Sequence, residues 1–230
     1  MPDTVNSLYE QLAPLTTILG QRVVENFSGD APDVDRWGFG NQDGTTGNLA
    51  SMADSVDGGL KLTCGTAAGG QSLWMSFMTG TSLTGSDNGT VTTIPFKPYS
   101  STGAVMISVW KITSISSPAT SGGGFARDGR GDAAGANLAY ITAGTSQTYF
   151  NLRTADNGGS QTDTASTVAD DINWNTHKVE TKASSVDYSI NGLTNIISTT
   201  NLPTLGLAPQ FNSHRSGSVM HIRYCEAYNT

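Results

Sequence analysis

The sequence has few charged residues, and its basic residues form no cluster. Charged residues make up 13% of the 230 residues, and 19 Asp and Glu outnumber 12 Lys and Arg, so the formal net charge is −7. Binding to the phosphates of nucleic acid requires Lys and Arg gathered in a patch or stripe. Because the basic residues here are scattered along the chain, we expect no nucleic acid among the partners of this protein.

Long apolar runs are also missing. No segment approaches the roughly 20 apolar residues of a transmembrane helix, so we expect no membrane insertion. The opening residues Met1-Pro2-Asp3 lack the basic start of a secretory signal, and no apolar stretch of the required length follows them. These absences predict a soluble protein, or a subunit of an assembly built from soluble proteins.

The abundant residue types favour β-structure. Gly (27 residues), Ser, Thr and Asn suit a chain with many turns and solvent-facing hydroxyls, and they are poor formers of long helices. A length of 230 residues is sufficient for one large all-β domain with a single core.

Strand-like segments separated by turn residues follow one another from residue 60 onward. They span residues 60–64, 72–79, 91–96, 104–112, 137–142 and 147–153. Residues 104–110 are apolar on both faces, so we expect this strand at the centre of its sheet. Residues 113–136 and 154–171 are expected to be long loops, which in a compact domain are usually functional or mobile.

The clearest strand signals lie between residues 172 and 228. Residues 186–190 alternate between apolar and polar, and Asn191-Gly192 follows, the dipeptide best suited to the two positive φ angles of a type I′ turn. The chain should therefore double back over residues 193–199. A strand over residues 176–182, with His177, Val179 and Thr181 on one face, extends this hairpin to a three-stranded meander.

A closing strand is expected over residues 219–228. Simple alternation along this strand places Met220, Ile222, Tyr224 and Tyr228 on one side and Cys225 on the other.

The order of these pieces resembles the end of the concanavalin A-like jelly roll, the sandwich shared by legume-type lectins, laminarin-type glucanases and many modules of phage and secreted proteins. The matching features are Trp174, the segment VDYSING at 186–192, Leu202-Pro203 and HIRYCEAY at 221–228. Upstream, ENFSG at 25–29, Arg36-Trp37 and GLKLT at 59–63 are similar to the family's opening strands. The resemblance spans about residues 25–229 and implies an all-β jelly-roll sandwich of two antiparallel sheets.

Residues 1–24 differ from the rest of the chain and predict a short N-terminal helical arm, separate from a sandwich domain over residues 25–230. The apolar residues of this segment are spaced by three and four, and Pro14 interrupts them. Three interpretations stay open: a helix packed on its own sandwich, an arm that docks on a neighbouring subunit, and disorder. Docking would use the apolar stripe Leu8, Leu12, Leu15 and Leu19.

The resemblance also implies a disulfide and a metal site. It places Cys64 and Cys225 on neighbouring strands, where they form a disulfide or remain two free buried cysteines. Members of the fold often hold a structural calcium ion near the start of the domain, where Asp30, Asp33 and Asp35 lie close together. Their spacing is not that of the twelve-residue calcium loop, so a solvated acidic turn is the alternative, and no other cofactor is expected.

The glucanases that this fold resembles use paired glutamates, arranged E-x-D-x-x-E on one central strand, as nucleophile and proton donor. This sequence has only four Glu, at positions 10, 25, 180 and 226, and no two are close enough in sequence to share a strand face. The adjacent Asp170 and Asp171 would point to opposite sides of a strand. We therefore expect a protein that is not an enzyme, and a glycoside hydrolase with non-standard catalytic residues is the alternative.

These observations predict a structural protein of a virion or another extracellular assembly, of the decoration, capsid-surface or fibre type. Its partners would be other copies of itself or other structural subunits. A lectin-like glycan-binding module is the alternative, and the two functions are compatible. Aromatic rings that stack on sugars are the candidate binding residues, with core packing as the other interpretation of each: Trp74, Tyr149, Trp110, Tyr140 and Trp174.

Overall fold

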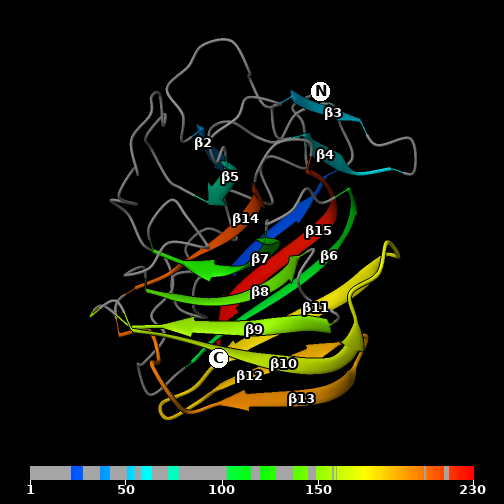
Figure 1. Ribbon diagram of the computed structural model, residues 1–230. Helices are drawn as coiled ribbons and strands as arrows, with labels where there is room; N and C mark the ends of the chain where they lie inside the picture. The colour runs from blue at the N-terminus through cyan, green and yellow to red at the C-terminus, as the bar shows by residue number, and fades with distance from the viewer. Residues whose placement is uncertain are drawn as a thin grey trace, which may run out of the picture.

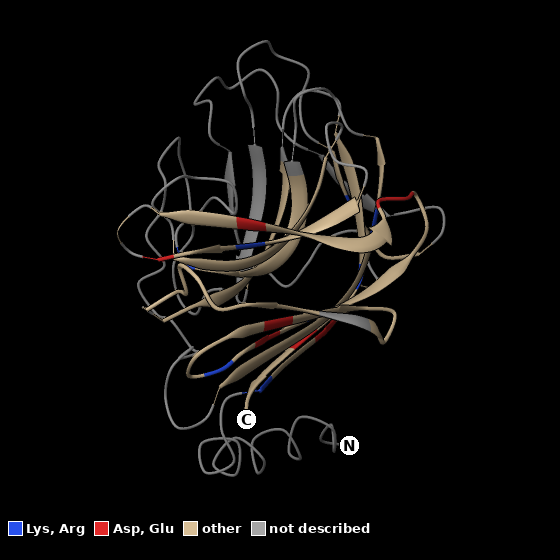
Figure 2. Ribbon diagram, turned by 60° about the horizontal axis from the view of Figure 1, so that its bottom comes forward, with Lys and Arg blue, Asp and Glu red and all other residues tan. Residues whose placement is uncertain are grey.

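The computed structural model describes residues 22–27, 37–41, 51–54, 58–63, 72–77, 103–114, 120–127, 137–144, 149–156, 158, 160–204, 206–214 and 218–230. These residues form the strands β1 to β15, which build two antiparallel sheets packed face to face (Figure 1). No helix in these ranges is long and apolar enough to cross a membrane. Figure 2 shows the same two layers from another side, with few charged residues along the strands. The expected all-β sandwich is confirmed.

The first sheet, sheet A, has the strand order β13-β12-β11-β6-β15-β4-β3, and β1 pairs with β15 beside β4. The segment that we expected at the centre of its sheet is β6, which lies between β11 and β15. The strands are β1 (Arg22–Asn26), β3 (Ser51–Asp54), β4 (Leu60–Thr63), β6 (Ala104–Ser114), β11 (Asn175–Thr181), β12 (Val186–Ile190), β13 (Leu193–Ser198) and β15 (Val219–Asn229).

The second sheet, sheet B, has the strand order β10-β9-β8-β7-β14-β5-β2. Its strands are β2 (Trp37–Asn41), β5 (Ser72–Phe77), β7 (Thr120–Ala126), β8 (Leu138–Gly144), β9 (Tyr149–Ala155), β10 (Gln161–Ala169) and β14 (Ala208–His214). The chain therefore passes repeatedly between the two layers, and residues far apart in sequence lie side by side in both of them.

The core between the sheets contains two groups of aromatic rings. Phe27, Trp37 and Phe211 form one group, with ring centroids 5.5 to 6.2 Å apart. In the other group Trp110 of β6 stacks on His177 of β11, with centroids 3.8 Å apart. Tilted and edge-on rings at such distances add to the stabilisation that burial of their apolar area provides.

The meander β11-β12-β13 is confirmed. Asn191 and Gly192 have φ angles of 52° and 71°, as a type I′ turn requires. A Cβ atom on Gly192 would meet no other atom within 4 Å, so the glycine serves the backbone conformation and not a close contact.

The expected faces of β15 are wrong in the second half of the strand. Ile222 is opposite Trp110 and Tyr224 is opposite Val109, so Arg223 is an additional residue, a β-bulge. The bulge reverses the alternation. Met220 and Ile222 lie in the core before it and Cys225 after it, whereas Tyr224 and Tyr228 are only partly buried and lie outside.

Two of the expected loops contain strands. β7 lies within residues 113–136, where its run Gly122-Gly123-Gly124 resembled a loop. A Cβ atom on Gly123 would lie 2.7 Å from the Phe211 ring and 3.1 Å from Trp110 Nε1, so glycine is needed for a close approach. β10 lies within residues 154–171; it is an edge strand with alternate residues exposed, which explains its polar composition.

The disulfide is not supported, although β4 and β15 are neighbours as expected. Cys64 lies outside the described residues. Cys225 is a free, buried cysteine.

The boundary of the sandwich lies before residue 25. β1 begins at Arg22 and pairs with β15 from Arg22 opposite Tyr228 to Asn26 opposite Tyr224. The Arg22 guanidinium also forms an ion pair of 2.6 Å with Glu226. Residues 22–24, which we assigned to the arm, therefore belong to the sandwich.

Candidate functional site

The outer face of sheet B, which points away from the core, carries polar side chains in register. Along β9, Phe150 and Leu152 point into the core, so Asn151 and Arg153 between them point outward. Strand β8 continues the two rows, because Thr142 is opposite Asn151 and Tyr140 is opposite Arg153. Directly opposite residues on one face lie about 5 Å apart, so these side chains are neighbours.

The same rows continue through β7 to β14. Gly122 and Gly124 of β7 stand between the residues of β8 and Asn212 and Gln210 of β14. Phe211, between these two amides, points into the core. We call six residues of the outward set the polar face: Tyr140, Thr142, Asn151, Arg153, Gln210 and Asn212.

Tyr140 is the aromatic centre of the polar face. Its hydroxyl donates a hydrogen bond of 2.8 Å to the Gly122 carbonyl oxygen, and the side chain is buried. A Cβ atom on Gly124 would lie 3.1 Å from Cδ2 of the tyrosine ring. The ring therefore lies across β7, in space that only glycine leaves open.

An ion pair closes the polar face at the edge strand. Arg153 Nε and Nη2 donate to the two carboxylate oxygens of Asp163 in β10, at 2.7 and 3.0 Å. This two-point geometry fixes the planes of both groups. The pair leaves this end of the face without net charge, while Arg153 is only 8% exposed.

Asn212 has an unused hydrogen-bonding atom. Its side chain is 1% exposed, and its Oδ1 accepts no hydrogen bond from the residues that the structure describes. A buried carbonyl oxygen without a donor costs about 1–3 kcal/mol. The oxygen is closed to solvent in this structure, so a ligand hydroxyl could bond to it only after a rearrangement that uncovers Asn212.

The described glutamates lie away from the polar face. Glu25, Glu180 and Glu226 stand on β1, β11 and β15, all strands of sheet A, and Glu10 lies outside the described residues. Glu25 is opposite the inward-facing Cys225, so Glu25 and Glu226 are on opposite sides of their sheet.

Asp170 and Asp171 follow β10 and differ in environment. Burial raises the pKa of Asp170 to about 6, although the Gly144 amide donates a hydrogen bond of 3.0 Å to its carboxylate. Partial burial also acts on Asp171, but hydrogen bonds from Asn173 and Asn175 outweigh it and lower the pKa of that carboxyl. The pKa values of the two neighbouring carboxyls are therefore shifted in opposite directions, at the connection from sheet B to sheet A.

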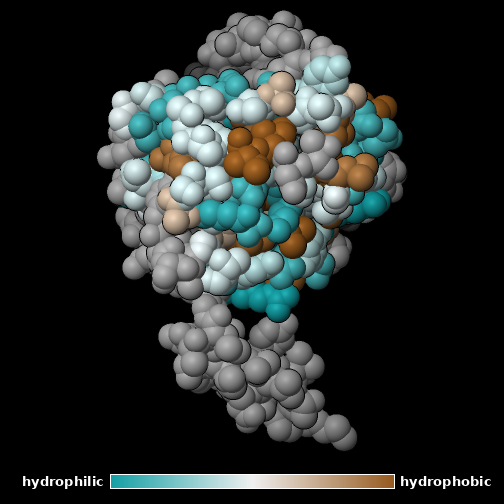
Figure 3. All heavy atoms as spheres, turned by 90° about the horizontal axis from the view of Figure 1, so that it is seen from below, coloured by the Kyte–Doolittle hydropathy of each residue, from teal (hydrophilic) through white to brown (hydrophobic). Residues whose placement is uncertain are grey.

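The outer surface of sheet A carries no broad apolar area in the described part of the chain. Leu193 and Ile197 of β13 are exposed by 66% and 57%. Figure 3 shows the molecule from below, and the hydrophobic side chains there form small groups separated by hydrophilic ones. Such scattered residues are usual on protein surfaces.

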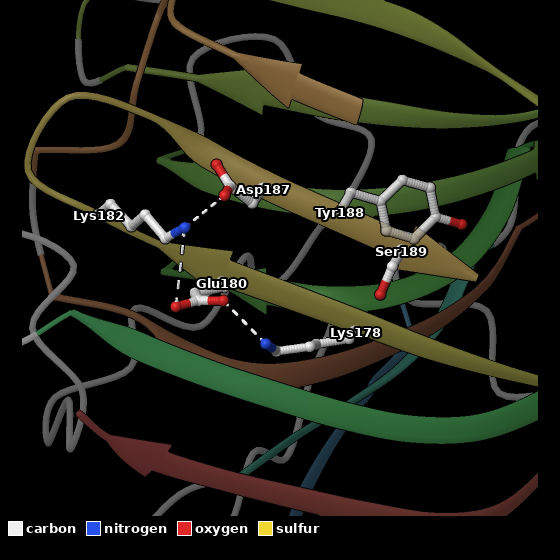
Figure 4. Close-up of a pocket in the computed structure, with 6 residues that line it drawn as sticks. All are labelled: Lys178, Glu180, Lys182, Asp187, Tyr188 and Ser189. Carbon is white, nitrogen blue, oxygen red and sulfur yellow. Dashed lines mark hydrogen bonds and ion pairs between the residues drawn. The ribbon is translucent and has the colours of Figure 1, made fainter. Parts of the chain in front are cut away.

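A shallow pocket on the outer side of β11 and β12 is lined by paired charges (Figure 4). Lys178 Nζ contacts Glu180 at 2.8 Å, and Lys182 contacts both Glu180 and Asp187. The hydrogen bond to Asp187 raises the pKa of Lys182. Because the pairs neutralise one another within the sheet surface, this pocket is a less suitable ligand site than the polar face.

The structure separates the five aromatic candidates. Tyr140 and Tyr149 lie on the outer side of sheet B, with Tyr149 42% exposed. Trp74 of β5 is opposite Asn212 of β14, so its position is in register with the polar face. The side chain of Trp74 lies outside the described part of the structure. Trp110 is buried between the sheets, and Trp174 packs on the far side of the molecule against Arg223.

Other expected site residues lie outside the described residues. They are the arm leucines Leu8, Leu12, Leu15 and Leu19 and the calcium candidates Asp30, Asp33 and Asp35. Within the described ranges, no group of three His, Cys, Asp or Glu side chains could hold a metal ion.

Most residues of the polar face were not predicted from the sequence. Thr142, Asn151, Arg153, Gln210 and Asn212 belong to three strands, and only register brings them together. One signal was present, because the residues APQFNSH of β14 place amides on both sides of a single Phe.

Two stacked antiparallel sheets in this strand order define a concanavalin A-like jelly roll. A structure described as a native glycosidic hydrolase is 14% identical and superposes with a TM-score of 0.58, covering 91% of this chain and 95% of its own. The β-glucanase of Bacillus licheniformis is 13% identical, with a TM-score of 0.57 and coverages of 91% and 98%.

A third similar structure comes from a phage. A carbohydrate esterase from the Shiga toxin-encoding bacteriophage phi24B is 13% identical, with a TM-score of 0.52 and coverages of 90% and 96%. The sequence itself matches no protein-family model and no curated protein. At these identities the similarity establishes the fold.

Proposed function

We propose that this protein is a non-catalytic, glycan-binding jelly-roll subunit of an extracellular assembly such as a virion. The observation that carries the proposal is the polar face, above all the buried Asn212 Oδ1 that accepts no hydrogen bond from the described residues. Saccharides present many hydroxyl donors, and a site built from a few fixed polar groups beside aromatic rings is the usual way to bind them.

The residues of the polar face have complementary roles in this proposal. Asn212 accepts a sugar hydroxyl once it is uncovered, and Asn151, the more exposed amide of the two rows, provides a further hydrogen-bonding group. Tyr149, at the start of β9, offers an exposed ring. Arg153 is already held by Asp163 and positions the edge of the face.

The arrangement of carboxylates supports binding without hydrolysis. Glycoside hydrolysis generally needs two carboxyl groups about 5–9 Å apart on either side of the scissile bond. On the polar face, the carboxylate nearest in register is Asp163, and it is engaged by Arg153. The described glutamates are on the other sheet.

Two points support membership of an assembly. Residues 1–21 precede the sandwich and carry the apolar stripe Leu8, Leu12, Leu15 and Leu19, which requires burial somewhere. One similar structure is a phage protein that acts on carbohydrate according to its description. Docking through residues 1–21 would gather several copies of the sandwich, and multivalent display would strengthen weak glycan binding.

The proposal is tested by exposing the purified chain to a panel of neutral oligosaccharides. We expect at least one glycan to bind with a dissociation constant between about millimolar and micromolar, as is typical of a small polar site. We expect no release of reducing ends over prolonged incubation. Release of reducing ends by the unmodified chain would contradict the non-catalytic part, and its loss on replacement of the residues of the polar face would place catalysis there. Binding to no glycan would contradict the binding part.

A further inference from the structure

A second cluster of functional side chains lies on the outer face of sheet A, on the other side of the molecule from the polar face. His221 of β15 is opposite Lys61 of β4 on one side and Lys111 of β6 on the other. The neighbours of His221 in sequence, Met220 and Ile222, point into the core, so this row points outward. Neighbouring strands are about 4.8 Å apart, so both lysines start within about 5 Å of the histidine backbone.

Trp174 draws two of the cations together. The Arg223 guanidinium lies 4.0 Å from the centroid of the indole ring, and Lys111 Nζ lies 5.0 Å from it. The His221 ring meets the indole edge-on at 6.3 Å and is held by a contact of 3.1 Å between its Nε2 and Thr113 Oγ1. Arg223 reaches this position because it is the additional residue of the β15 bulge. We call Lys61, Lys111, His221, Arg223 and Trp174 the Trp174 cluster.

The cluster is positively charged, whereas the chain as a whole is negatively charged. It gathers three of the 12 Lys and Arg, namely Lys61, Lys111 and Arg223, in a protein whose net charge is −7. Like charges repel, and cation–π contacts with Trp174 offset part of that repulsion. A pre-organised group of cations of this kind lowers the cost of binding an anion.

The register across sheet A brings the cations into one row. In β3 the residue opposite Lys61 is Ala53, so Ala53, Lys61, His221 and Lys111 stand side by side across four strands. Asp171, three residues before Trp174, accepts hydrogen bonds from Asn173 and Asn175.

We propose that the Trp174 cluster binds an anionic saccharide through one carboxylate or sulfate group. The planar guanidinium of Arg223 suits two-point contact with such a group, and the two lysines add charge on flexible stems. Three cations match a single anionic group, whereas nucleic acid requires a longer basic stripe. Only the choice of a saccharide over another small anion rests on the proposed glycan-binding function; the anion site stands on the cluster itself.

The test measures affinity for a tetrasaccharide of galacturonate, with neutral cellotetraose and a short DNA duplex as comparison probes. The double variant Lys61→Gln/Lys111→Gln is compared with Lys178→Gln/Lys182→Gln. The second variant removes two positive charges from the same outer face of sheet A, in the ion-paired pocket. Thermal unfolding verifies that both variants fold, and Arg223→Gln gives an independent single substitution in the cluster.

We expect the cluster variant to bind tetragalacturonate at least about tenfold more weakly and the control variant to change its affinity less than about threefold. Arg223→Gln should behave as the cluster variant does. Equal losses in both double variants would show attraction by overall charge and overturn the proposal. No binding by the unmodified chain, or equally tight binding of the duplex, would overturn it too.

The Asn212→Ala variant separates this site from the polar face. It should retain binding to tetragalacturonate, because Asn212 is on the other sheet. If neutral glycans fail to bind while tetragalacturonate binds through the cluster, the proposed function fails and the Trp174 cluster stands. If Asn212→Ala abolishes tetragalacturonate binding, the anion site is not at Trp174.

Discussion

The indole ring of Trp110 and the imidazole ring of His177 stack at the centre of the sandwich, 3.8 Å apart and 11° from parallel. His177 Nδ1 lies 3.2 Å from the Tyr188 hydroxyl, and the histidine is fully buried. Burial lowers the pKa of His177 to about 3, so the ring is neutral at neutral pH. The stack ties β6 to β11 without a charge in the core.

The stability of the protein should therefore depend on pH between about 6.5 and 3. The unfolded chain binds a proton at His177 near pH 6.5, whereas the folded chain does so only near 3. The unfolded state takes up more protons in this window, so the free energy of unfolding falls as pH falls. We expect His177→Phe to show a smaller loss between pH 6.5 and 4 in urea unfolding. An identical loss in both proteins would contradict the burial of a neutral histidine.

Asp170 should act in the opposite direction. Burial raises its pKa to about 6 in the folded state, against 3.8 ordinarily, so the folded state binds more protons between these values. Asp170 therefore destabilises the fold above pH 6, and this penalty is relieved as pH falls toward 4. In Asp170→Asn we expect a steeper loss of stability on acidification from pH 6 to 4 than in the unmodified chain. A shallower loss would mean that this carboxyl is ionised throughout.

Gly123 is expected to be intolerant of any side chain. A Cβ atom there would meet the Phe211 ring at 2.7 Å and Trp110 Nε1 at 3.1 Å, so Gly123→Ala should lower the free energy of unfolding by about 1–3 kcal/mol. Gly158→Ala is the matched control, since Gly158 is exposed and its closest contact is the Asp156 side chain at 3.2 Å. Equal effects of the two substitutions in urea unfolding would contradict the close approach of β7 to the core.

Cys225 should be unreactive in the folded protein and free of any disulfide. Burial, with the nearby Glu25 and Glu226 carboxylates, raises the pKa of the Cys225 thiol, so little thiolate forms. In Cys64→Ser we expect alkylation of Cys225 only after unfolding. In the unmodified chain, denatured without reductant, mass spectrometry should find two alkylated cysteines. If neither cysteine is alkylated, the two cysteines form a disulfide and this prediction is wrong.

Removal of residues 1–21 should affect assembly and leave the sandwich intact. β1 begins at Arg22, and its pairing with β15 does not involve the preceding segment. We expect a chain that starts at Arg22 to keep its unfolding temperature and to sediment as a smaller species than the full chain. If the two chains sediment alike, or if the truncated one unfolds at a much lower temperature, the segment serves its own sandwich instead.

Local pattern was sufficient to predict part of the fold. The meander β11-β12-β13 follows from alternation and from Asn191-Gly192, both of which are local in sequence. Strand β7 was missed because the reason for Gly123 is a contact with Phe211, a residue far along the chain. The faces of β15 were predicted wrongly because a bulge at Arg223 leaves no local signal in composition.

The candidate site depended even more on register. Tyr140 and Tyr149 were identified as aromatic residues on strands, yet Asn212 joins them only through the pairing of β8, β7 and β14. Trp110 and Trp174 were also named as candidates, with core packing as the favoured interpretation of both. Trp110 is buried in the core, and Trp174 packs against Arg223, so neither belongs to the polar face.

The most direct test of the central claim compares the affinity of the unmodified chain and of Asn212→Ala for the neutral oligosaccharide that binds best. We expect the variant to bind about tenfold or more weakly, because the sugar loses a buried acceptor. Ser189→Ala, on the outer face of sheet A, should bind as the unmodified chain does. Equal affinity of all three proteins would contradict the assignment of the polar face as the glycan site.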